Sequence, residues 1–114
     1  MPFIQVSTTF EKKEDAQKMA RHLTEKKLAG CVQIVGPIES TYWWENKIET
    51  TVEWLCLIKS NAARYETLEA EILRLHPYKT PEIIATAIVD GSPAYLNYLT
   101  LSVEKSGSEL SQGQ

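Results

Sequence analysis

The feature that most constrains this fold is a long pair of β-rich runs between residues 29 and 59, separated by a polar turn centred on Asn46. Both runs are rich in β-branched and aromatic residues, and Asn tolerates the positive φ that a tight turn requires. The pattern therefore predicts a β-hairpin. Ordinary strands have about 5 or 6 residues, and each run here is roughly twice that length. Gly36-Pro37 predicts a bulge or bend in the first run.

Side-chain alternation indicates how much of this hairpin is covered. Both faces are apolar from Trp54 to Ile58, whereas nearer the turn only one face is apolar. We therefore expect the base of the hairpin to lie in a covered sheet and its far end to protrude. Exposed aromatic residues in a cluster are typical of a contact with another chain. The predicted oligomer interface consists of Tyr42, Trp43, Trp44 and Trp54; alternatively, the indole rings fold back onto the helices of the same chain.

Length and charge narrow the class of protein. The chain has 114 residues, which predicts one domain, and a net charge of −3, which disfavours nucleic acid as a partner. No apolar run approaches the roughly 20 residues that span a bilayer, so we expect no membrane partner. The N-terminal residues lack the pattern of a signal peptide, and a cytoplasmic location is the expectation.

The sequence also argues against an enzyme. Cys31 and Cys56 lie at different distances from Asn46, so we expect free thiols and no disulfide. Cys-x-x-Cys motifs, paired histidines at helical spacing, Gly-rich phosphate loops and nucleophile elbows do not occur in the sequence. An acylphosphatase-like loop would need an Arg after the first strand, and an RNA-recognition module would need aromatic residues in a basic sequence; neither pattern is found.

The remaining elements follow from periodicity and capping. We expect a strand over residues 3–9, a helix over 11–28 that is ended by Ala29-Gly30, and a second helix over 62–75 capped by Ser60 or Asn61. Pro77 ends that helix near His76. The apolar residues 83–89 predict an interior strand. Ser92 and Pro93 begin a third helix that extends to 103, and residues 104–114 have the composition of a disordered tail.

This order of elements predicts one α+β domain over residues 1–103, a ferredoxin-like βαββαβ sandwich with a long central hairpin and an extra C-terminal helix. Such a sheet carries its two helices on one face. Apolar residues on both faces of the hairpin base indicate that the second face is covered as well, which favours an oligomer.

Several of these segments resemble the CutA divalent-cation tolerance proteins. The similar segments include residues 28–34 (LAGCVQI), the pattern Ser40-x-Tyr42-x-Trp44, and residues 76–83 (HPYKTPEI), and the match extends over most of residues 3–101. The resemblance implies a very stable homotrimer in which ferredoxin-like subunits wrap long hairpins around one another, as in PII-type proteins. Asn46 and Tyr98 depart from the family, since many relatives have Gly and Trp there.

The same resemblance implies a link to copper. Some relatives are proposed to bind copper through a cysteine late in the first strand and a pair of histidines before Pro-Tyr. The matching positions here are Ser7 and Leu75, which leaves His76 as the candidate metal ligand. Copper affinity depends on several nitrogen or sulfur ligands, so we expect at most a weak site for copper or another divalent cation, shared between subunits or with Glu82. Alternatively, His76 caps the free carbonyls of its helix.

A second candidate site is a ligand cleft between subunits. Tyr78, Lys79 and Glu82 follow His76 on one turn, and with Lys59 they are predicted to line a cleft for a small anionic ligand. Lys59 and Glu53 are equally compatible with an intersubunit salt bridge. His22 has no partner ligand one helical turn away, so we interpret it as a rim histidine.

The sequence is compatible with two functions. The first is a non-enzymatic homotrimer associated with the response to divalent metal ions, copper in particular. The alternative is a PII-like small-molecule sensor or interaction scaffold with ligand clefts between its subunits.

Overall fold

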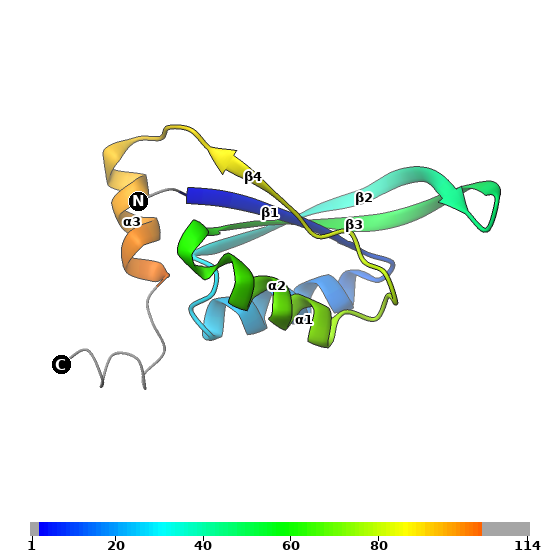
Figure 1. Cartoon of the computed structure of the whole chain (residues 1–114), viewed down its shortest axis with the longest axis horizontal. Helices are drawn as coiled ribbons and strands as arrows, with labels where there is room; N and C mark the ends of the chain where they lie inside the picture. Colours follow the sequence, from blue (N-terminus) through cyan, green and yellow to red (C-terminus); the bar gives the residue numbers. More distant parts are fainter. Residues whose placement is uncertain (1–2, 104–114) are drawn as a thin grey trace.

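A computed structural model describes residues 3–103 as one antiparallel sheet with two helices on one face and a third helix at one end (Figure 1). The elements in chain order are β1 (Phe3–Phe10), α1 (Lys13–Glu25), β2 (Cys31–Trp44), β3 (Lys47–Asn61), a 3₁₀ turn (Ala62–Arg64), α2 (Tyr65–Leu75), β4 (Ile84–Ile88) and α3 (Pro93–Ser102). The tail predicted over 104–114 lies outside the described residues. Within residues 3–103, no helix is long and apolar enough to cross a membrane.

The sheet has the strand order β2-β3-β1-β4, and every neighbouring pair is antiparallel. In the register, Val6 of β1 pairs with Ile58 of β3 on one side and with Ala85 of β4 on the other. With α1 and α2 covering the same face of the sheet, this arrangement confirms the predicted ferredoxin-like α+β fold (Figure 1).

The core lies between this sheet face and the two helices. Alternate residues of β1 point into it, and the helical stripes of α1 and α2 close it from the other side. Its fully buried members include Val6, Phe10, Leu23, Cys56, Ile58, Leu68 and Ile72. The two cysteines are free, as expected from their register, because Cys31 pairs with Lys59 and Cys56 pairs with Ile34.

The hairpin has the predicted turn and the predicted bulge. Glu45 and Asn46 both adopt positive φ, 50° and 65°, between the paired residues Trp44 and Lys47. The register shifts between Val35 and Ile38, at Gly36-Pro37. Beyond this bulge β2 and β3 form a two-stranded ribbon, residues 38–53, that extends past the helices (Figure 1). We call this ribbon the hairpin arm.

The strand predicted as interior is at the edge of the sheet. β4 pairs with β1 on one side, and within the described residues its other side has no strand neighbour. Ile84 is accordingly 54% exposed. An apolar run indicates that both faces of a strand are suited to burial. It does not indicate whether the residues that bury those faces belong to the same chain or to another.

The first helix is shorter than predicted, because it ends at Glu25 in a Schellman motif. The Leu28 amide donates to the carbonyl of Leu23 (3.0 Å), the Lys27 amide donates to that of Thr24 (3.1 Å), and Lys27 adopts a φ of 57°. Gly30 does not end the helix. It allows close packing of α3, because a Cβ there would lie 2.9 Å from Leu99 Cδ2.

The caps predicted for the other two helices are present, although α2 begins at Tyr65, three residues later than predicted. Asn61 Oδ1 accepts from the Arg64 amide (3.1 Å) at the 3₁₀ turn that precedes α2. Ser92 caps α3 by accepting from the Tyr95 amide (3.3 Å), with Pro93 in the first turn. The helix α3 is docked through its buried Leu99 and through Tyr98, whose hydroxyl donates to the carbonyl of Gly30 (2.9 Å).

The unusual conformation of Lys27 leads to the first prediction. A residue with a Cβ costs about 1–2 kcal/mol in the left-handed region, and glycine avoids this cost while losing more entropy on folding. We expect Lys27→Gly to raise the free energy of unfolding by about 0.5–1 kcal/mol in urea titrations. Lys26→Gly is the matched control, because Lys26 has a φ of −80° and gains nothing from glycine. Equal destabilisation by both substitutions would contradict the prediction.

Candidate functional site

The polar cluster around His76 occupies the point where the hairpin arm leaves the sheet. His76 follows α2 directly, and its backbone is extended (φ −70°, ψ 134°), so the chain turns away from the helix before Pro77. The imidazole is 8% exposed and stacks on Phe10, with ring centroids 4.2 Å apart and an interplanar angle of 12°. This packing holds the ring against the end of β1.

Both ring nitrogens of His76 are engaged by backbone groups. Nδ1 accepts from the amide of Tyr78 (3.1 Å), and Nε2 lies 2.9 Å from the carbonyl of Thr9. An acceptor at Nδ1 assigns the proton to Nε2, which donates to Thr9, and the ring is therefore neutral in this arrangement. Burial lowers the pKa of His76, which favours the same state. One of the two interpretations from the sequence, that the imidazole caps the carbonyls of α2, is wrong. The ring bonds to the Thr9 carbonyl and the Tyr78 amide instead.

These contacts limit what His76 offers to a metal ion. A metal at either nitrogen has to replace a hydrogen bond to the backbone. Among residues 3–103, no group of three or more His, Cys, Asp or Glu side chains is arranged to hold a metal. At the two departures from the copper pattern, Ser7 is half-buried on β1 and Leu75 is exposed at the end of α2.

Tyr78 links the same cluster to the hairpin. Its hydroxyl donates to Glu53 Oε2 at 2.7 Å, and the Glu53 side chain is almost completely buried, with the residue 7% exposed. The pKa of Tyr78 is raised, mainly by burial and to a smaller extent by this hydrogen bond. The intersubunit salt bridge suggested for Glu53 stays a prediction, and within the chain its hydrogen-bond partner is a neutral tyrosine. The position of Glu53 between the apolar residues Val52 and Trp54 of a strand is the sequence signal that could have indicated a buried carboxylate.

The predicted cleft residues lie in two places in a single chain. Tyr78, Lys79 and Glu82 share the loop between α2 and β4, and the last two are exposed. Lys59 lies six positions along β3 from Glu53, which is about 20 Å at the rise of an extended strand. It pairs with Cys31 and Gln5, and its ammonium donates to the side chain of Gln33. A cleft that contains all four residues therefore stays a prediction about neighbouring chains.

The hairpin aromatics fall into two groups. Tyr42, Trp43 and Trp44 are 40%, 72% and 54% exposed, respectively, and they lie on the hairpin arm beyond the helices. Trp54 is half-buried in its own chain: it packs against Gly36, where an added Cβ would lie 2.4 Å from its ring, and Lys13 Nζ is 5.2 Å from the ring centroid. Of the four predicted interface residues, the three nearest the turn are thus the most exposed in one chain.

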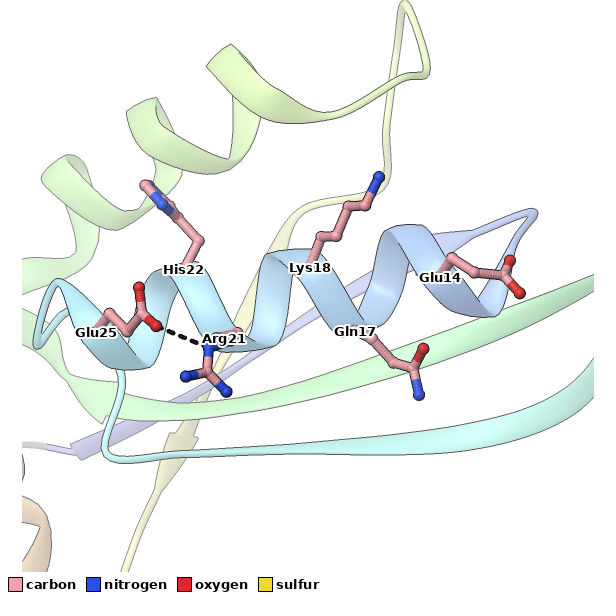
Figure 2. Close-up of a pocket in the computed structure, with 6 residues that line it drawn as sticks. All are labelled: Glu14, Gln17, Lys18, Arg21, His22 and Glu25. Carbon is pink, nitrogen blue, oxygen red and sulfur yellow. Dashed lines mark hydrogen bonds and ion pairs between the residues drawn. The ribbon is translucent and has the colours of Figure 1, made fainter.

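His22 joins the two helices. It points from α1 toward α2 (Figure 2), where its Nε2 lies 2.6 Å from Glu71 Oε2, and Arg74 donates to the other carboxylate oxygen (2.7 Å). Arg74 first and His22 second hold the pKa of Glu71 at about 2. An open depression of about 540 Å³ runs along the outer side of α1, with the Arg21–Glu25 ion pair at its edge. Its lining residues all come from this one helix, so it is a helix surface and not a cleft.

The buried neutral state of His76 predicts a loss of stability in acid. Its folded-state pKa lies below its ordinary value of 6.5, so the unfolded chain binds this proton more readily. The stabilisation is complete above pH 6.5 and declines as the pH falls through 6.5 toward the lower folded-state value. We expect the melting temperature of the wild type to fall more steeply between pH 7.5 and 5 than that of His76→Gln, whose amide does not titrate. A constant difference between the two proteins over this range would contradict the prediction.

Comparison with known proteins identifies the family of the chain. The model of the CutA1 divalent ion tolerance protein family matches residues 4–102. Protein CutA 1, chloroplastic, from Oryza sativa is 39% identical over 93% of this chain, which spans 60% of that protein's length. The divalent-cation tolerance protein CutA of Archaeoglobus fulgidus is 38% identical over 80% of this chain and 88% of its own length.

Solved structures give the same result. CutA1 from Oryza sativa superimposes with a TM-score of 0.90 at 39% identity, covering 93% of this chain and 97% of that one. CutA from Xylella fastidiosa has a TM-score of 0.87 at 34% identity and covers 90% of this chain and 98% of its own. Sequence and fold agree over nearly all of the described residues, and the chain belongs to the CutA1 divalent ion tolerance protein family.

Proposed function

We propose that this chain acts in tolerance of divalent metal ions, copper in particular, as a non-enzymatic homotrimer that is assembled through its hairpin arm. Relatives that are 36–38% identical carry the name divalent-cation tolerance protein, which supports the metal-related role. The observation that carries the assembly is the exposure of Tyr42, Trp43 and Trp44 on an arm that projects beyond its own domain. A two-stranded ribbon is marginally stable in water unless it packs on something else.

The contribution of His76 to metal binding is weak in this proposal. Copper reaches its ring only by displacing the Tyr78 amide or the Thr9 carbonyl, and each displacement leaves a backbone group without its partner. An affinity reduced in this way suits a protein that meets the metal transiently. His76, Tyr78 and Glu53 are residue types that enzymes use as acids and bases, but here they are engaged in hydrogen bonds with one another and with the backbone, which supports a non-enzymatic role.

The alternative of a PII-like small-molecule sensor rests on the shared architecture. In one chain Lys59 is distant from the loop that carries Tyr78, so this proposal needs the loop of one copy to meet β3 of another. We regard it as the second candidate, with less support from the described contacts than the metal-related role.

The proposed assembly predicts the molar mass of the wild type in solution, and it predicts that substitutions in the hairpin arm lower that mass. Light scattering of the wild type is expected to give three times the chain mass of 12.9 kDa. Tyr42→Ser together with Trp44→Ser removes apolar surface from the exposed arm, so the variant should dissociate to single chains on dilution. Leu73→Ser is the matched control, because this exposed residue lies on α2 and its loss should leave the mass unchanged. A monomeric wild type would refute the assembly.

The metal-related role is tested by calorimetry and by growth. Titration of Cu²⁺ into the wild type is expected to show weak binding that decreases in His76→Gln and persists in His22→Gln, with circular dichroism to verify folding. In bacteria that lack their own CutA, the wild-type chain should restore growth at raised copper. Binding that is equal in all three proteins would exclude His76, and a failure to restore growth would count against the role itself.

A further inference from the structure

The root of the hairpin arm lies where the central strand of the sheet stops. The last pair between β1 and β3 joins Phe10 to Trp54. From the next pair, Ile38 with Glu53, to the turn, β3 is paired within the described residues with β2 alone. The direction of the hairpin arm therefore depends on contacts made at this root, since no third strand supports the ribbon beyond it.

One face of the root is held by the loop that follows α2. The chain of contacts begins at the Thr9 carbonyl, which accepts from His76 Nε2 (2.9 Å). It continues from His76 Nδ1, which accepts from the Tyr78 amide (3.1 Å), to the Tyr78 hydroxyl, which donates to Glu53 (2.7 Å). Residues 76–78 thus connect the end of β1 to Glu53, the residue of β3 at which the hairpin arm leaves the sheet.

The opposite face of the root is held by Trp54. Neighbouring residues of a strand point to opposite faces, so Trp54 lies across the sheet from Glu53. Its ring packs against Gly36 at the bulge, with Lys13 above it. The root is therefore held on one face by an aromatic side chain of the strand itself, and on the other by the loop that carries His76 and Tyr78.

We propose that residues 76–78 are a strap that sets the direction of the hairpin arm, and that displacing the strap from Glu53 releases the arm. The Glu53 carboxylate is buried, and a hydrogen bond to a charged group contributes more than one between neutral groups. Loss of the Tyr78 hydroxyl leaves this carboxylate short of a donor, which favours opening of the root. The inference deepens the proposed function, because the arm is the element through which copies of the chain assemble.

Hydrogen exchange of backbone amides tests the strap. Tyr78→Phe removes the hydroxyl and keeps the ring; we expect exchange in residues 38–44 and 47–53 to become about tenfold faster, as for the loss of one hydrogen bond to a charged group. Tyr98→Phe is the matched control, because it removes a hydroxyl bond to Gly30 at the other end of the molecule. Glu53→Gln keeps an acceptor for Tyr78 but removes its charge, so its exchange should lie between that of the wild type and that of Tyr78→Phe.

The outcomes distinguish the proposed role of the strap from the proposed assembly. Faster exchange confined to the hairpin arm in Tyr78→Phe supports the strap, and so does the same pattern in Glu53→Leu, which removes the acceptor instead. Equal effects of Tyr78→Phe and Tyr98→Phe on the arm, or no effect of either, would overturn it. Light scattering on the same samples reports the assembly independently: a monomer whose arm responds to Tyr78→Phe keeps the strap and refutes the trimer.

Discussion

The pairing of β1 with β3 is the constraint on which the rest of this structure depends. Eight consecutive pairs, from Phe3 with Asn61 to Phe10 with Trp54, place the shorter strand against one half of the longer one. The core lies over this shared half, and the hairpin arm is the part of β3 that β1 does not reach. The length of β1 therefore decides both where the domain ends and where the arm begins.

The same boundary gathers three buried polar residues, Thr9, Glu53 and His76. Thr9 and Phe10 end β1 opposite Leu55 and Trp54 of β3. Glu53 is the next residue of β3 beyond this end, and the loop after α2 crosses at this level through His76. A strand that ends inside a sheet leaves backbone groups that need partners, and the His76 imidazole donates to one of them, the Thr9 carbonyl, while it accepts from the Tyr78 amide of its own loop. Burial then keeps that ring neutral, which is the state that the two hydrogen bonds require.

Local features were predictable because they depend on neighbouring residues. The turn at Asn46, the bulge at Gly36-Pro37, and the caps formed by Asn61 and Ser92 all follow from the conformational preferences of those residue types. The family motifs, which were read from the same segments, identified the fold correctly. The end of α1 was less accessible, because Lys27 occupies a left-handed position for which the usual signal is glycine.

The arrangement of the candidate site depended on contacts between distant residues. The sequence pointed to His76 and Tyr78, but it did not indicate that Thr9, 67 positions away, and Glu53, 25 positions away, are their partners. The sequence by itself determined the hairpin, the order of elements and the family, since these arise from local periodicity and motif. Only the tertiary structure decided that β4 is an edge strand and that His76 is buried and neutral. Burial and hydrogen-bond partners are properties of packed surfaces, and no single segment of this chain contains them.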